Sequence, residues 1–212
     1  FVSRFGPNAV AAYGTAIRIE QIALVPTIGL NIALAALVGQ NNGAGRLDRV
    51  ASSYRMALLF GLLIMAGVLT PVILLAPRLL GQFTANAGVV GIALAYLYIQ
   101  LLSYYSYVAM NLSNAVLQGL KRPAAIMWVG LYRQLLAPLL VFPLLTTVAG
   151  LGVRGVFWGL VLVNWSAAAA TLLHAHRRLR LAALGPAPGG EAVRTASAPV
   201  FGCAEPETLQ TV

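Results

Sequence analysis

The amino-acid sequence predicts an all-α integral membrane protein, a helical bundle with about five transmembrane helices. Of its 212 residues, 59% are hydrophobic and only 9% are charged, whereas a soluble domain carries about 25% charged residues. The apolar residues also form long blocks, and a helix needs roughly 20 mostly apolar residues to cross a hydrocarbon core of about 30 Å. We therefore expect these blocks to be buried in lipid and against neighbouring helices.

Turn-forming residues separate the apolar blocks. Residues 39–45 are rich in glycine and asparagine, and further turns are predicted at 119–123 and 150–155. Prolines inside the blocks do not exclude spans, because neighbouring helices can satisfy the backbone groups that a proline leaves unpaired. We expect a transmembrane lobe over residues 1–180, with spans at about 8–38, 50–80, 88–118, 124–148 and 153–176.

The basic residues predict the orientation of these spans. Eight of them lie at alternate span ends and three at the opposite ends, and cytoplasmic loops are enriched in Lys and Arg. The eight are Arg46, Arg49, Arg55, Lys121, Arg122, Arg177, Arg178 and Arg180; the three are Arg4, Arg78 and Arg154. We therefore expect a multi-pass protein of the cell (inner) membrane with a cytoplasmic C-terminus. Residues 181–212 have no hydrophobic period and are expected to be a disordered cytoplasmic tail.

Several functional classes are excluded by composition. The net charge of +9 does not indicate nucleic-acid binding, because the basic residues lie at the ends of apolar blocks. Cys203 is the one cysteine, and His174 and His176 point to different helix faces, so we expect no metal site. The spans contain no catalytic pair of residues, so the chain is not predicted to be an enzyme or to hold a cofactor.

Glu20 is the one carboxylate inside a predicted span. An ionisable group in a membrane is costly and usually faces the bundle interior or a water-filled cavity. There it can exchange a proton or offer oxygen atoms to a sodium ion. Tyr13, Thr27 and Asn31 lie within about 20° of Glu20 around the helix. We expect Glu20 and Asn31 to form a cation or proton site; a static ion pair between Glu20 and Arg133 is the alternative.

The third span has a polar stripe along one face. Its seven residues occupy a sector about 80° wide; they are Tyr96, Gln100, Tyr104, Tyr107, Asn111, Asn114 and Gln118. Lipid offers no hydrogen-bond partners, so this face must contact protein or water. We expect the residues from Gln100 to Asn114 to line a substrate cleft, with tyrosines suited to organic cations. Hydrogen bonding between helices is the alternative.

Two arginines also lie within spans. Arg18 projects nearly opposite Glu20 around the first helix, so the two do not pair there. Arg133 lies about ten residues into the fourth span, ahead of Pro138 and Pro143, which break the helix ladder. We expect both arginines to be structural counter-charges.

Two segments resemble the multidrug and toxic compound extrusion (MATE) family. Residues 9–50, AVAAYGTAIRIEQIALVPTIGLNIALAALVGQNNGAGRLDRV, are similar to its eighth-helix region, and residues 112–123, LSNAVLQGLKRP, to the end of its tenth helix. The resemblance implies helices eight to twelve of twelve, that is, a C-terminal lobe lacking its first helix. The missing N-terminal lobe of the same polypeptide would then be a partner, and the chain a fragment.

The resemblance also implies a function for the whole protein. It would export cationic or amphipathic organic compounds by alternating access, driven by inward flow of sodium ions or protons. The span that resembles the tenth helix contains no acid, which leaves Glu20 as the candidate coupling residue. A lipid-linked oligosaccharide flippase of the same superfamily and a membrane assembly subunit without transport activity are the alternatives.

Overall fold

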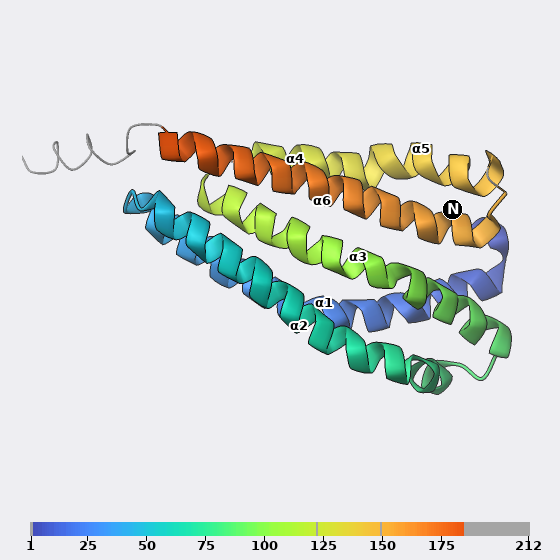
Figure 1. Cartoon of the computed structure of the whole chain (residues 1–212). Helices are drawn as coiled ribbons and strands as arrows, with labels where there is room; N and C mark the ends of the chain where they lie inside the picture. The colour runs from blue at the N-terminus through green and yellow to red at the C-terminus, as the bar shows by residue number, and fades with distance from the viewer. Residues whose placement is uncertain (1, 122, 149, 185–212) are drawn as a thin grey trace, which may run out of the picture.

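The computed structural model describes residues 2–121, 123–148 and 150–184, and among them it contains helices and no strand (Figure 1). A short 3-10 helix precedes the first long helix. In chain order the elements are η1 (Val2–Phe5), α1 (Pro7–Gly43), α2 (Leu47–Phe83), α3 (Ala87–Gly119), α4 (Ala124–Leu131), η2 (Tyr132–Leu136), α5 (Ala137–Pro143), η3 (Leu144–Val148) and α6 (Gly152–Leu184).

Five helical segments within the described residues are long and apolar enough to cross a membrane. They are α1, α2, α3, the continuous segment Ala124–Thr147 and most of α6, which confirms the predicted fold class. The helices extend beyond the predicted spans. The helix α1, for example, has 37 residues and is about 55 Å long, so it continues past the apolar layer of the membrane. The helix α6 continues to Leu184, so the expected tail begins as helix. Residues 185–212 lie outside the described residues.

The fourth span is irregular in the way its prolines predict. Two π-helical turns, η2 and η3, interrupt it. Pro138 has no backbone N–H and cannot bond to the carbonyl of Gln134, which lies within η2. Such π-helical turns occur often at functional sites, and η2 carries Arg133.

The central element of the bundle is α3. It packs against α1, α2 and α6, whereas the fourth span packs mainly on α6 (Figure 1). Small residues on α1, among them Ala12 and Ala16, are buried and allow close approach of the backbones. A Cβ added to Gly119 would lie 2.5 Å from Val38 Cγ1, so α1 and α3 are also in close contact at the end of α3.

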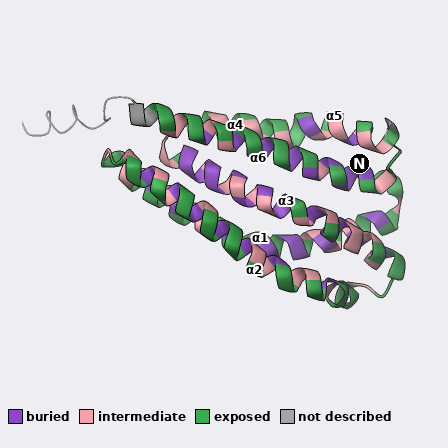
Figure 2. Ribbon diagram, viewed as in Figure 1, coloured by how far each residue is buried: buried purple, intermediate pink, exposed green. Residues whose placement is uncertain are grey.

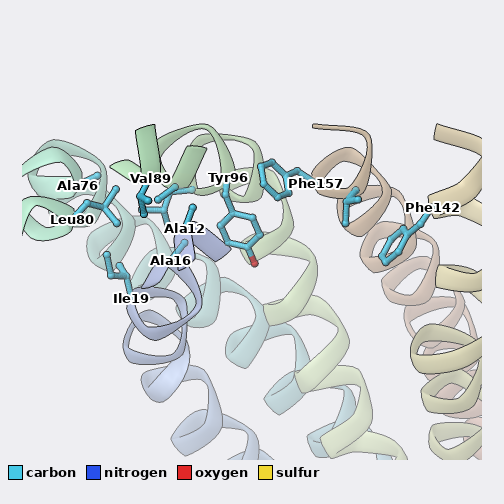
Figure 3. Close-up of a cluster of buried hydrophobic side chains, with 12 residues drawn as sticks. Ala12, Ala16, Ile19, Ala76, Leu80, Val89, Tyr96, Phe142 and Phe157 are labelled. Atoms are coloured by element: carbon cyan, nitrogen blue, oxygen red, sulfur yellow. The ribbon is translucent and has the colours of Figure 1, made fainter. Parts of the chain in front are cut away.

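Buried residues lie where the helices face one another, and exposed residues cover the outer faces (Figure 2). Many of the exposed residues are large and apolar. In one buried cluster, Tyr96 of α3 lies between Ala12 of α1 and Phe157 of α6 (Figure 3). Ile22, Leu74 and Leu140, for example, are each at least 70% exposed. A membrane protein exposes such residues to lipid or to neighbouring helices.

Candidate cation site and polar cleft wall

Glu20 lies in α1 against α3 and is only 7% exposed. The Tyr96 hydroxyl donates a hydrogen bond to Glu20 Oε2 over 2.5 Å. The alternative, a direct ion pair with Arg133, is not formed among the described residues, since Arg133 donates its recorded hydrogen bonds to uncharged partners. The buried carboxylate of Glu20 is therefore held by a neutral donor.

Aromatic rings hold Tyr96 in this position. Its ring packs edge-to-face on Tyr13 at 5.3 Å and on Phe157 at 5.1 Å between centroids. Because these rings come from α1 and α6, the Tyr96 hydroxyl is fixed by all three helices. Edge-to-face pairs prefer this separation and contribute about 0.5–1.5 kcal/mol each beyond burial.

A pocket of about 190 Å³ lies beside Glu20. It is lined by Tyr13, Ile17, Glu20, Gln21, Leu24, Tyr96, Gln100, Tyr107 and Leu160. One water occupies about 30 Å³ of liquid, so this space suits an ion with a few waters, whereas drug-sized ligands need roughly 300–1,000 Å³. The Gln100 side-chain oxygen is buried and has no recorded hydrogen bond within the described residues. Carboxylate, amide and phenol oxygens thus gather here.

Arg133 forms a second polar cluster next to this pocket. Its Nη2 donates to the Tyr107 hydroxyl over 2.8 Å, and its Nε donates to Asn164 Oδ1 over 2.9 Å. The guanidinium also lies 4.7 Å from the centroid of the Tyr107 ring. Because Tyr107 lines the Glu20 pocket as well, Arg133 fixes one of the pocket walls.

The structure does not bring Asn31 to Glu20. The Asn31 side-chain amide donates to the backbone carbonyl of Asn111 over 2.5 Å. Eleven residues separate Asn31 from Glu20, which is about 16 Å along the helix. One cation cannot contact both side chains at that separation.

The predicted stripe on α3 divides between the pocket and the protein interior. Gln100 and Tyr107 line the pocket, whereas Tyr104 is fully buried in a cluster with Met65 and Leu69 of α2. Asn111 and Asn114 are half-buried further along α3 and lie outside the lining of this pocket. The structure therefore places three members of the predicted cleft wall outside the Glu20 pocket.

Arg18 is exposed on the outward face of α1. Within the described residues Arg18 has no recorded hydrogen bond or ion pair. The described residues also contain no group of His, Cys, Asp and Glu able to hold a metal ion.

Asn164 is a site residue that the sequence reasoning missed. It is 2% exposed and accepts the hydrogen bond from Arg133. A signal was present, because Asn164 is the one amide side chain within residues 153–176, and polar groups inside a span mark buried contacts.

Comparison with known proteins places these features in a family. The MatE family model matches residues 1–144. A "Probable multidrug resistance protein NorM" from Pseudomonas aeruginosa is 31% identical over 160 residues, which are 73% of this chain and 33% of that relative. The chain thus spans about a third of the length of this curated relative.

Solved structures show the same fold. An outward-facing multidrug resistance MATE family transporter matches with a TM-score of 0.78 at 23% identity, over 84% of this chain and 40% of the other. An inward-facing one matches with a TM-score of 0.78 at 21% identity, over 85% and 44%. These neighbours are transporters, in agreement with the prediction that the chain is not an enzyme. Because the family model covers more than half of its residues, this multi-pass membrane chain belongs to the MatE family.

Proposed function

We propose that the chain forms most of the C-terminal lobe of a secondary-active exporter. The full-length transporter, completed by an N-terminal lobe, moves cationic or amphipathic organic compounds out of the cell in exchange for sodium ions or protons. It lies in the inner membrane with its C-terminus in the cytoplasm, in accordance with the excess of basic residues at that end.

The carboxylate of Glu20 in its pocket is the observation that carries this proposal. A carboxylate that is 7% exposed is costly in a membrane unless it has a function or a counter-charge; Arg133 attracts it at a distance, but no arginine of the described residues forms a direct ion pair with it. The pocket surrounds it with hydroxyl and amide groups, and oxygen atoms are the ligands by which transporters coordinate sodium ions. A proton needs only the carboxylate itself.

The substrate contacts a wider surface than the ion. Tyr13 and Tyr107 line the pocket, and their rings offer faces to an organic cation. The pocket alone is too small for a drug-sized molecule, so the remaining walls of the substrate cleft come from the N-terminal lobe.

Alternating access is supported by the likeness of this lobe to both outward-facing and inward-facing transporters, each at a TM-score of 0.78. The two states would then differ chiefly in how two rigid lobes are arranged, as in other secondary transporters.

The alternatives have less support. An assembly subunit without transport would have Glu20 packed on all sides, whereas a pocket of about 190 Å³ lies beside it. A flippase for lipid-linked oligosaccharides needs a cationic cavity, whereas the lining of this pocket contains an acidic residue, Glu20, and no Lys or Arg.

Substitution of the carboxylate tests the coupling role. In the full-length transporter, Glu20→Gln keeps the side-chain size and removes the charge. We expect ion-driven efflux of a cationic dye from proteoliposomes to fall more than tenfold, with loss of its dependence on the sodium or proton gradient. Asp48→Asn is the matched control, because Asp48 is exposed in the first turn of α2. If Glu20→Gln retains gradient-dependent efflux like the control, Glu20 does not couple transport to the ion.

A further inference from the structure

A basic pocket lies where α3 leads into α4 and where α6 reaches its last turns. These segments lie together at one end of the bundle (Figure 1). Its volume is about 420 Å³. It is lined by Lys121 after α3, by Ala124, Ala125 and Trp128 of α4, and by His174 and Arg178 of α6. The Glu20 pocket has a separate lining.

Two cationic side chains face this pocket. Arg178 Nε donates to His174 Nε2 over 3.3 Å, and both residues are half-buried. This contact holds the guanidinium against the pocket and leaves its Nη groups without a recorded partner among the described residues. No carboxylate is among the described residues that line the pocket. The pocket is therefore positively charged and offers N–H donors to an anion, and it would repel an organic cation.

The backbone at Lys121 is in the left-handed region, with φ of 57°. Helices commonly end in this conformation with glycine, which adopts it without steric cost. Lys121 is the one non-glycine residue with positive φ in the described chain. A glycine at position 121 would end the helix at lower conformational cost, but this position holds a lysine, whose side chain lines the pocket.

The surroundings of the pocket are those of a membrane interface. Trp128 is 64% exposed, and tryptophan is enriched at the level of lipid headgroups. Leu131 and Leu135, one and two turns further along the same span, are also exposed. An anion in the pocket would thus have apolar surface beside it on the side of the membrane interior.

We propose that this pocket binds the phosphate group of an anionic phospholipid. Lys121 and Arg178 contact the phosphate, His174 orients Arg178, and the acyl chains lie along Leu131 and Leu135. Basic pockets between transmembrane helices bind anionic headgroups in this way. Free phosphate has the same charge chemistry but no acyl chains, so the exposed leucines favour the lipid. This inference does not depend on the transport function.

Lipid titration of the full-length protein tests the proposal. The melting temperature of the purified protein in a neutral detergent is followed during addition of phosphatidylglycerol, of phosphatidylcholine or of inorganic phosphate. We expect phosphatidylglycerol alone to raise the melting temperature at micromolar concentration. Each basic residue near an anionic headgroup favours binding about fivefold, so Lys121→Gln with Arg178→Gln should weaken phosphatidylglycerol binding by more than tenfold.

Two further variants make the result specific. Arg46→Gln with Arg49→Gln removes two exposed charges at the same end of the bundle but outside the pocket, and should leave lipid affinity nearly unchanged. Lys121→Gly removes the ammonium and relieves the backbone strain, so it should melt at the same or a higher temperature without lipid but bind phosphatidylglycerol about fivefold more weakly. Equal shifts with phosphatidylcholine or with inorganic phosphate, or equal losses in the Arg46 and Arg49 control, would overturn the proposal.

Discussion

The polar stripe of α3 has two halves that resemble each other in sequence and differ in their surroundings. The half from Tyr96 to Tyr107 borders the Glu20 pocket through Tyr96, Gln100 and Tyr107. At the other half, α1 lies directly on α3: Asn31 donates to the carbonyl of Asn111, and Asn42 donates to that of Gly119 over 3.4 Å. The first half is a pocket wall and the second is an interhelical contact.

The difference shows that polar residues in a membrane helix do not by themselves indicate a cavity. At the second half, Gly119 has no side chain and Val38 packs against its backbone, so the helices close and the side-chain amides of Asn31 and Asn42 donate to backbone carbonyls of α3. At the first half, Tyr96 packs edge-to-face on Tyr13 of α1 in a cluster that also holds Ala12 and Ala16, and a pocket remains beside Glu20. The outcome at each half depends on the side chains that α1 presents to it.

The largest effect on stability is expected at the second half of the stripe, from Asn111 to Gln118, where α1 and α3 are in close contact; we call it the closed half. Gly119→Ala would place a Cβ 2.5 Å from Val38 Cγ1 and 3.0 Å from the backbone nitrogen of Gly39. Overpacking of this kind costs about 1–3 kcal/mol, which thermal unfolding of the full-length protein in detergent would measure. Gly14→Ala on α1 is the control, because a Cβ there has no neighbour within 4 Å. Equal melting temperatures for the two variants would contradict the close contact.

The sequence predicted the fold more fully than the site. Apolar block length is a direct consequence of membrane thickness, so the five spans follow from it. Glu20 was identified because a lone carboxylate in a span is unusual. The distinction between Gln100 in the pocket and Tyr104 in the core could not be predicted, because both lie in one sector of α3 and the distinction depends on which helix faces each one. Asn164 was missed because its role depends on Arg133, a residue of another helix.

A smaller effect is expected at Asn31. Asn31→Leu preserves the side-chain size and removes the hydrogen bond to Asn111, so the free energy of unfolding should fall by about 1 kcal/mol, as for other interhelical bonds in membranes. Because Asn31 lies about 16 Å along the helix from Glu20, the ion dependence of efflux in proteoliposomes should not change. A changed ion dependence would instead show that Asn31 contributes to the cation site together with Glu20.

The last change, at Tyr96, is expected to act on function and not only on stability. Tyr96→Phe keeps the ring contacts with Tyr13 and Phe157 and removes only the hydroxyl that binds Glu20, so any fall in melting temperature should come from this one hydrogen bond and not from lost packing. A hydrogen bond to a charged group contributes about 1.5–3 kcal/mol, so the ion concentration for half-maximal efflux should shift on the order of tenfold. Tyr54→Phe removes an equally buried hydroxyl that bonds to Ser113 beside the closed half of the stripe. If both variants shift the ion dependence alike, the two halves do not differ in function; if only Tyr96→Phe does, the pocket wall is the part of α3 that acts on the coupling ion.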